Sequence, residues 1–221
     1  MSAQPDASNP MLAAEHGDYF ANHARARRLP WSLYHRPLEA NLATYLRRLP
    51  PRAEVTVIGC GLLHELDQAP ADVRLTVVDV DARAVATVQA RGDARVVRGV
   101  VVAPTDTIDQ HVSHQALIYA KEVVEHVVPP QPWIDGCAHA LAPGGRLWLS
   151  TPNYGEPWLA ALEATALELV ARRDGFTRRG LHPSRYSAAR LRTALMAAGL
   201  ADVAVTTTWH RLALTGTGVR R

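Results

Sequence analysis

The fold of this chain is decided by residues 117–153, which hold two short motifs on either side of a proline-rich break. The first motif reads Leu117-Ile-Tyr-Ala-Lys-Glu-Val-Val-Glu-His-Val, and the second reads Ala138-His-Ala-Leu-Ala-Pro-Gly-Gly-Arg-Leu-Trp-Leu-Ser-Thr-Pro-Asn. An apolar run that ends in acidic residues and a histidine predicts a buried strand followed by a turn. The second motif predicts the end of a helix, a tight Pro-Gly-Gly turn and another strand. Together they predict a strand–helix–strand unit of an α/β fold.

An earlier segment, residues 55–79, has the pattern of a nucleotide-binding unit. It begins with the run Val55-Thr-Val-Ile-Gly-Cys-Gly, whose glycines, Gly59 and Gly61, suit a tight turn that a ligand approaches closely. A second apolar run ends in Asp79, and 79 − 59 = 20 residues separate it from Gly59. A carboxylate at this interval accepts hydrogen bonds from a ribose diol. The segment therefore predicts a site for a nucleoside-containing cofactor.

The two segments, in this order, resemble class I S-adenosylmethionine (SAM) methyltransferases. The patterns Glu-x-x-Glu-His-Val and Leu-x-Pro-Gly-Gly are similar first to the ubiquinone-biosynthesis O-methyltransferase group, and then to the small-RNA 2′-O-methyltransferases. The resemblance covers residues 31–200 and is specific over residues 117–153. It implies SAM as the cofactor. It also implies a Rossmann-like, doubly wound, mostly parallel sheet with a C-terminal antiparallel hairpin.

A set of cofactor contacts is expected from the strand ends and from the resemblance. Arg36 matches an arginine that the ubiquinone group places on the carboxylate of the cofactor, where a bidentate pair is favourable. The alternative for Arg36 is an exposed position on an amphipathic helix. The expected cofactor-binding residues are Arg36, Gly59, Gly61, Asp79, Val80, Ala120 and Lys121.

Four positions depart from the pattern of the family. Val57 stands where the first strand usually carries an acidic residue, and Leu63 replaces the third glycine of the loop. Val100 stands where an aspartate near the adenine is frequent, and Ala116 replaces the aspartate of a Phe-Asp pair. Each change removes a polar contact without making the fold implausible. A degenerate, non-catalytic methyltransferase-like binding protein is therefore one alternative.

Chemistry is expected at Glu122, Glu125 and His126, whose spacing of i, i+3 and i+4 gives one shared face if the turn is helical. Two carboxylates and an imidazole at the end of a strand can hold a divalent ion, Mg²⁺ or Zn²⁺, that acidifies a substrate hydroxyl. The resembling families place a further histidine at the position of His182, as a fourth ligand or a general base. The alternative is a metal-free site, with Glu122 as a cap and His126 as the base. His126 and His182 are the catalytic candidates.

Composition limits the class of protein. The 221 residues carry a net charge of +3 and are 48% hydrophobic, which suits one globular domain and gives little reason to expect nucleic acid binding. Cys60 and Cys137 lack the spacing of a metal or disulfide motif. No apolar run approaches the roughly 18 residues of a membrane span. We expect a cytoplasmic protein, with a disordered leader over residues 1–15 and one methyltransferase domain over residues 16–221.

Residue periodicity predicts two N-terminal helices within residues 16–50, followed by alternating strands and helices. Such alternation implies a parallel sheet covered on both faces. Helices are expected over residues 18–28, 32–48, 62–69, 82–91, with Asp81 as the N-cap, and 132–141. Strands are expected over residues 54–59, 74–79, 95–98, 115–120 and 145–150, and a closing hairpin over 200–208 and 210–215.

Residues 154–186 interrupt this alternation and predict a lid. Residues 158–171 carry an apolar stripe at helical spacing, and residues 172–179 form a basic run. One interpretation is a helix packed over the active site and followed by a solvated loop. The other is an element that contacts a membrane surface or a lipophilic substrate, because an apolar stripe, Trp158, Phe176 and arginines suit such an interface.

The resemblance, together with these residues, implies a SAM-dependent O-methyltransferase that acts on a hydroxyl of a small, lipophilic or phenolic acceptor. The expected partner is this small molecule, with peripheral membrane contact through residues 154–180 and without nucleic acid. An RNA 2′-O-methyltransferase is a second alternative, because that family shares Glu-x-x-Glu-His and Thr-Pro-Asn. It would need a basic groove, and the N-terminal arginines and residues 172–179 are the clusters that offer one.

Overall fold

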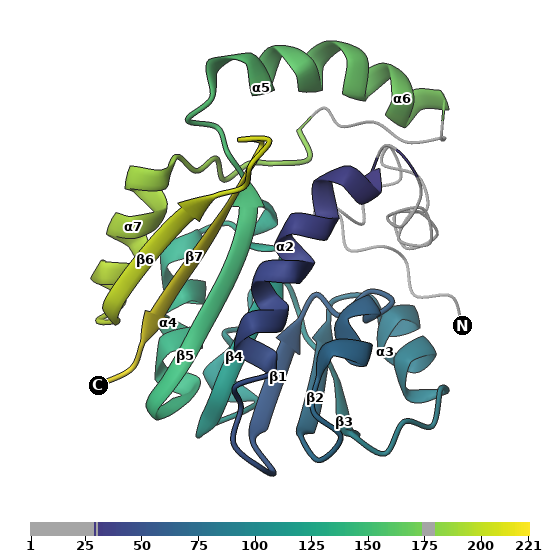
Figure 1. Cartoon of the computed structure of the whole chain (residues 1–221), viewed down its shortest axis with the longest axis vertical. Helices are drawn as coiled ribbons and strands as arrows, with labels where there is room; N and C mark the ends of the chain where they lie inside the picture. Colours follow the sequence, from purple (N-terminus) through teal and green to yellow (C-terminus); the bar gives the residue numbers. More distant parts are fainter. Residues whose placement is uncertain (1–28, 30, 174–179) are drawn as a thin grey trace.

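Seven strands form one sheet in the part of the chain that the structure describes, residues 29, 31–173 and 180–221 of a computed structural model (Figure 1). The strand order is β3-β2-β1-β4-β5-β7-β6, in which β1 to β5 are parallel and β7 is antiparallel to both of its neighbours. The predicted doubly wound sheet with a C-terminal antiparallel hairpin is confirmed. The strands are β1 (Glu54–Ile58), β2 (Arg74–Asp79), β3 (Val96–Val101), β4 (Gln115–Lys121), β5 (Leu141–Pro152), β6 (Ala201–Thr207) and β7 (Ala213–Val219).

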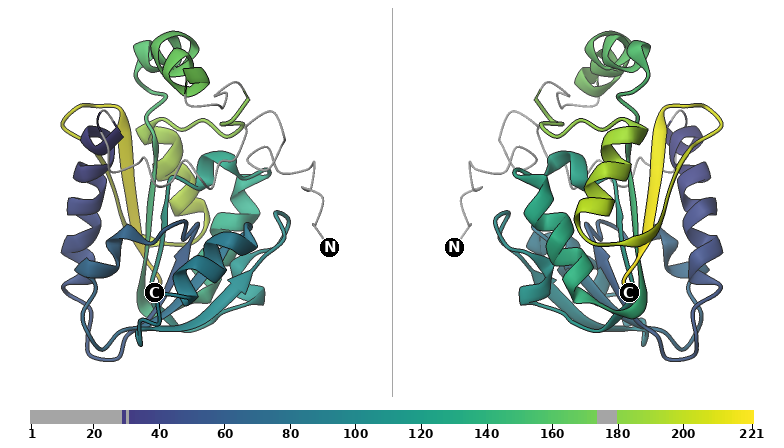
Figure 2. Two further views of the ribbon diagram at one scale, coloured as in Figure 1. Left: turned by 90° about the vertical axis from the view of Figure 1, so that its right-hand side faces the viewer. Right: turned by 90° about the vertical axis from the view of Figure 1, so that its left-hand side faces the viewer.

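Helices cover both faces of the sheet (Figure 2). Short 3₁₀ turns follow or precede several of the strands. The helices on the two faces are α2 (Trp31–Leu46), α3 (Ala82–Gln89), α4 (Pro130–Ala140) and α7 (Ala188–Ala197), and the 3₁₀ turns are η4 (His64–Gln68), η5 (Ile108–Gln110) and η6 (Val124–His126).

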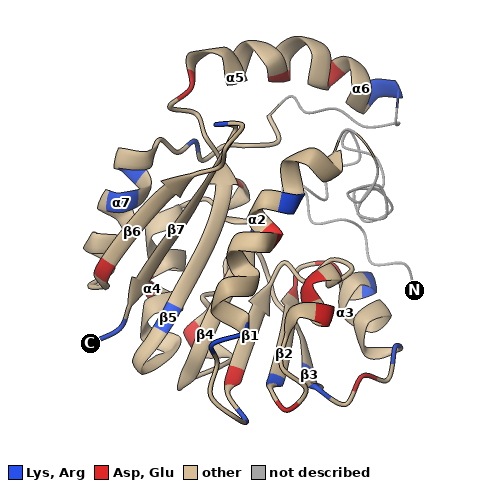
Figure 3. Ribbon diagram, in the orientation of Figure 1, with Lys and Arg blue, Asp and Glu red and all other residues tan. Residues whose placement is uncertain are grey.

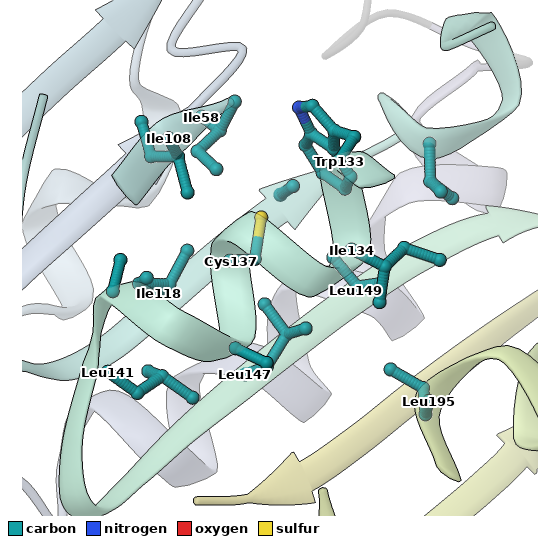
Figure 4. Close-up of a cluster of buried hydrophobic side chains, with 14 of the residues drawn as sticks. Ile58, Ile108, Ile118, Trp133, Ile134, Cys137, Leu141, Leu147, Leu149 and Leu195 are labelled. Carbon is teal, nitrogen blue, oxygen red and sulfur yellow. The ribbon is translucent and has the colours of Figure 1, made fainter. Parts of the chain in front are cut away.

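Buried side chains alternate along β4 and divide the core into two clusters. Leu117 and Tyr119 belong to a cluster with α2, η4 and α3, whereas Ile118 and Ala120 belong to a cluster with α4 and α7. Successive residues of a strand point to opposite faces, so this alternation buries the sheet on both sides. Figure 4 shows the second cluster, in which Cys137 of α4 lies among the aliphatic side chains.

Two predicted elements differ in the structure. Residues 62–69 form only the turn η4, because Leu63 takes a left-handed conformation (φ 41°) just before it and Pro70 follows it. The last strand covers Ala213–Val219 instead of residues 210–215. Side chains fix a turn before it, where the amide of Leu212 donates to Nδ1 of His210 at 3.1 Å.

The ends of other helices and strands agree with the sequence-based prediction in some cases and differ in others. Asp81 caps α3 as expected, since its carboxylate accepts from the amide of Arg83 at 2.9 Å. Helix α7, which Ser187 caps, was not predicted. Strand β5 begins at Leu141, four residues earlier than expected, so the Pro-Gly-Gly segment over residues 143–145 lies within the strand and does not form the predicted tight turn. The predicted leader over residues 1–15 and the helix over residues 18–28 lie outside the described residues.

An arm of residues 157–173 lies beyond one end of the sheet (Figures 1 and 2). In it, α5 (Pro157–Leu162) continues through a π-helical turn, η7 (Glu163–Leu167), into α6 (Glu168–Arg173). Trp158 and Leu169 are 45% and 71% exposed. Within the described residues, no helix is both long and apolar enough to cross a membrane. Most of the predicted basic run over residues 172–179 lies outside the residues that the structure describes.

Candidate functional site

The two sequence motifs meet at the carboxyl ends of β1, β2 and β4. Because β1 pairs in parallel with both β2 and β4, Gly59, Asp79 and Glu122 lie at the same edge of the sheet, where open α/β sheets bind ligands. Gly59 has a φ of +69°, and a Cβ there would lie 2.4 Å from Cγ2 of Val123. Glycine is therefore required for the two motifs to pack together, a reason that the sequence does not reveal.

The carboxylate of Asp79 organises the loop after β1. Its Oδ2 accepts a hydrogen bond from the amide of Gly61 at 3.0 Å, and its Oδ1 accepts one from the amide of Asp81 at 3.0 Å. Each carboxylate oxygen has two lone-pair directions, so each can accept a further bond from a ribose hydroxyl. Asp79 is thus held in place by the backbone and fits the nucleoside end of the predicted cofactor.

Cys60 lies between the two glycines of this loop. Burial, and then the charge of Asp79, raise the pKa of its thiol far above the ordinary value. The thiol therefore stays protonated, and Cys60 acts in packing and not as a nucleophile.

Two of the residues that depart from the family pattern, Val57 and Leu63, are buried in the hydrophobic core. Val57 is 2% exposed and pairs with Val77 and Tyr119 on the neighbouring strands. Leu63 has φ 41° and ψ 57°, a conformation that glycine adopts freely, and its side chain is buried. The loop therefore keeps the backbone shape that suits glycine, while Leu63 adds apolar packing.

Lys121, at the end of β4, lies in a buried group of charges. Its ammonium contacts a carboxylate oxygen of Glu65 and lies 3.2 Å from Oε1 of Glu39. Burial is the largest single influence on the pKa of Glu65 and would raise it, but the charge and the hydrogen bond of Lys121, with smaller contributions, together hold that pKa below the ordinary value. Burial would likewise lower the pKa of Lys121, and the two carboxylates instead raise it. This triad joins α2, η4 and β4. The contact of the cofactor with the backbone of Ala120 and Lys121 stays a prediction.

Glu122 takes a direction that the sequence did not predict. Its φ is +58°, so it is not part of the turn η6, and the shared face with Glu125 and His126 does not form. Its carboxylate instead accepts hydrogen bonds from the hydroxyl of Tyr34 at 2.6 Å and from the hydroxyl of Ser150 at 3.0 Å. Glu122 is therefore bound to α2 and β5.

Glu125, His126 and His182 form a compact group of possible ligands. One ligand atom from each residue lies within 4.8 Å of the others. The Nδ1 of His126 lies 2.8 Å from the carbonyl oxygen of Leu181, so it is the donor there and Nε2 carries the lone pair. Glu125 is 0% exposed and His126 is 7% exposed. The structure thus brings His182 to this group and leaves Glu122 outside it.

The donor set of this group fits a divalent ion. Two imidazoles and one carboxylate suit Zn²⁺, Mn²⁺ or Fe²⁺ better than Mg²⁺, which prefers oxygen ligands. The buried hydroxyl of Tyr186 makes no hydrogen bond among the described residues. Burial is the main reason that its pKa is raised to about 12. The charge of Arg190 lowers this pKa, and the charge of Glu125 raises it. A protonated, buried donor of this kind suits a water or ligand oxygen at the group.

His182 is in turn held by two residues that the sequence did not single out. Its Nδ1 lies 2.6 Å from the hydroxyl oxygen of Tyr154 and 3.3 Å from Oε1 of Glu163. No local pattern could have found this contact, because Tyr154 and His182 are 28 positions apart.

Two further predicted cofactor residues lie near the edge of the sheet. Val80 follows β2 and is half-buried. Arg36 is exposed on α2, and it makes no hydrogen bond or ion pair with the described residues. Its predicted contact with the carboxylate of the cofactor stays a prediction.

The fold and the edge site define a class I methyltransferase, and comparisons with known proteins agree. A family model of the methyltransferase domain matches residues 25–205, so the chain belongs to this family. This membership confirms the predicted class of protein, the class I SAM-dependent methyltransferases.

Two curated relatives are ubiquinone biosynthesis O-methyltransferases. The protein of Idiomarina loihiensis is 29% identical over 159 residues, which cover 69% of this chain and 63% of the relative. That of Salmonella arizonae is 36% identical over 62 residues, which cover 26% of each chain. The chain thus matches less than two thirds of the length of either relative.

Solved structures share the fold at low sequence identity. The SAH-bound magnesium protoporphyrin IX methyltransferase of Synechocystis has a TM-score of 0.65 and 17% identity, over 94% of this chain and 97% of that chain. A putative methyltransferase in a complex with the Haloferax volcanii Trm112 activator has a TM-score of 0.66 and 18% identity, over 91% and 97% of the two chains.

Proposed function

We propose that this protein transfers a methyl group from SAM to a hydroxyl of a small acceptor that is lipophilic or phenolic. The observation that carries the proposal is the orientation of His126. Because its Nδ1 donates to the carbonyl of Leu181, its Nε2 is the atom that would take a proton, beside Glu125 and His182. The names of the two curated relatives support oxygen as the methylated atom.

Each side of the site has its own task in this reaction. Asp79 would hold the ribose, and the turn from Gly59 to Gly61 would bring the backbone to the cofactor. SAM, when bound, supplies a reactive sulfonium methyl group. The remaining task of the chain is to align the hydroxyl, remove its proton through His126 and exclude water.

A divalent ion would be held by Glu125, His126 and His182. It would acidify the acceptor hydroxyl and orient a neighbouring oxygen of the acceptor. In that case His126 serves as a ligand, and in the metal-free case it serves as the base.

Transfer to a panel of acceptors tests the proposal. The protein is incubated with SAM and with a catechol that carries an apolar tail, a simple phenol or a short single-stranded RNA, and the products are identified by mass spectrometry. We expect a methyl ether on the catechol. Methylated RNA, together with RNA binding that weakens steeply with salt, would favour the RNA alternative. Binding of SAM without transfer to any acceptor would favour the degenerate binding protein.

Chelation separates the two forms of the site. If a metal is used, dialysis against a chelator removes activity, Zn²⁺ or Mn²⁺ restores it, and Glu125→Gln loses ion and activity together. Full activity after chelation, with Glu125→Gln active and His126→Ala inactive, would leave His126 as a simple base.

Peripheral contact of the arm with a membrane is part of the same proposal. Trp158 and Leu169 are exposed on the arm, and Arg172 and Arg173 stand at its end (Figure 3). Aromatic and apolar side chains next to arginines suit an anionic bilayer surface. Sedimentation with anionic vesicles should be reduced by Trp158→Ser and Leu169→Ser together. Equal sedimentation of this variant and the parent would remove the arm from the contact.

A further inference from the structure

Tyr154, Glu163 and His182 form a chain of short contacts between the arm and the candidate site. The hydroxyl oxygen of Tyr154 lies 2.6 Å from Oε2 of Glu163 and 2.6 Å from Nδ1 of His182. The side chains of His182 and Glu163 are only 8% and 13% exposed. The contact therefore joins three segments in a largely dry place: the end of β5, the arm and the segment before α7.

The protons of this chain can be assigned from the acceptor and donor capacity of each group. A carboxylate can only accept, so the hydroxyl of Tyr154 donates to Glu163. The oxygen of that hydroxyl then accepts from His182, which requires a proton on Nδ1. Neutral His182 is thus the Nδ1–H tautomer, and its Nε2 carries the lone pair that a base or a metal ligand needs.

The helix of the arm changes its geometry at Glu163. A π-helical turn begins there and ends at Leu167. Such turns are rare in proteins, and those that do occur are often found at functional sites. Ala164, Thr165 and Ala166 in this turn are exposed, whereas Glu163 is half-buried. Glu163 is thus directed inward, toward His182, from a surface turn.

We propose that Glu163 and Tyr154 are positioning residues for His182. Through them, the docked position of the arm fixes the tautomer and the orientation of His182. With the arm docked, His182 is held with Nε2 as the reactive nitrogen beside Glu125 and His126. When the arm is displaced, Glu163 is withdrawn, and His182 loses the partner that fixes its tautomer and orientation. The coupling rests on the proposed role of His182 in methyl transfer, whereas the tautomer does not depend on it.

Nitrogen NMR of the whole protein, labelled with ¹⁵N-histidine, reads the tautomer without any reaction. The signal of His182 is assigned by its loss in His182→Gln. We expect the Nδ1–H form in the parent and a shift toward Nε2–H in Glu163→Ala, in which the hydroxyl of Tyr154 can donate to Nδ1 instead. Tyr154→Phe, in which the carboxylate of Glu163 can still accept from Nδ1, should keep the parent tautomer. Glu163→Gln keeps an oxygen acceptor for Tyr154 and should retain more of the Nδ1–H form. Persistence of the parent tautomer in Glu163→Ala would overturn the assignment of these residues as positioning groups.

Kinetics and hydrogen exchange test the coupling. Tyr154→Phe and Glu163→Ala should lower kcat roughly 10- to 100-fold, as loss of an outer partner of a catalytic histidine does, with the KM for SAM unchanged. Because coupling is reciprocal, His182→Gln should also speed amide exchange of the arm, by roughly tenfold for one lost charge-assisted hydrogen bond. Glu168→Gln, a change on the same arm at a residue that pairs with Arg172 and not with His182, should leave kcat unchanged.

The outcomes separate this inference from the proposed function. Unchanged arm exchange in His182→Gln would overturn the coupling, as would an unchanged kcat in both Tyr154→Phe and Glu163→Ala. A parent protein that methylates no hydroxyl would defeat the proposed function, while the NMR experiment would still decide the tautomer.

Discussion

The proposed cofactor side of the sheet edge, at Asp79, and the proposed acceptor side, at His126 and His182, are built in different ways. On the cofactor side, Asp79 is fixed by amides that lie 18 and 2 positions from it in the chain. On the acceptor side, His126 is fixed by a carbonyl 55 positions away, and His182 by a hydroxyl 28 positions away. The difference shows that a short motif can specify a cofactor loop, whereas the reacting groups depend on how distant segments pack.

The largest effect should follow from removing the imidazole of the acceptor side. His126→Ala is expected to slow methyl transfer by about 10²- to 10⁴-fold, the usual contribution of a general base, and to leave the Kd for SAM unchanged. Single-turnover transfer and calorimetry measure the two quantities. His139→Ala, at an exposed histidine of α4, is the control and should change neither. A large loss of SAM affinity in His126→Ala would show that the two sides are not separate.

The second effect concerns the charged triad of Lys121, Glu65 and Glu39, which joins β4, η4 and α2. Lys121→Met leaves the buried carboxylate of Glu65 and that of Glu39 without their cation. The free energy of unfolding should fall by about 3–5 kcal/mol, as when one partner of a buried pair is removed. Urea denaturation measures the change. Arg74→Gln removes a surface pair with Glu54 and should lower the free energy of unfolding by less than about 1 kcal/mol. Equal losses in the two variants would mean that the triad stabilises the fold no more than a surface ion pair does.

The third effect is confined to the cofactor side. Asp79→Ala should weaken SAM binding by about 1.5–3 kcal/mol, the contribution of charge-assisted hydrogen bonds to a ribose. Calorimetry measures the affinity, and Asp81→Asn, which keeps a good helix cap, is the neighbouring control. Equal affinities of Asp79→Ala and the parent would remove Asp79 from the site.

The smallest effect is on the stability of the protein in acid. The folded pKa of Glu65 is lowered, so its ion pair contributes stability above the unfolded carboxyl pKa of about 4.3, and this stability is lost as the pH falls through the folded value. Stability curves of the parent should therefore fall more steeply with acid than those of Glu65→Gln. Parallel curves would show that Glu65 does not titrate with unfolding.

Much of the fold could be predicted from the sequence, because glycine turns and apolar runs act locally. The site was predicted unevenly for the same reason. Asp79 and the pair Glu125 and His126 follow from spacing, but the departure of Glu122 depends on Tyr34 of α2, 88 positions away. Helix α7 was missed, although Ser187 is a good cap, because Leu191 and Leu195 are its only fully buried apolar side chains among many alanines.

The most direct test of this division is the single-turnover rate of methyl transfer at saturating SAM, measured for the parent, Asp79→Ala and His126→Ala. Asp79 acts through cofactor affinity, so saturation should return Asp79→Ala to within about tenfold of the parent rate. His126 acts in the chemical step, so His126→Ala should stay slow at any concentration of SAM. Recovery of His126→Ala at high SAM, with Asp79→Ala still slow, would contradict the account.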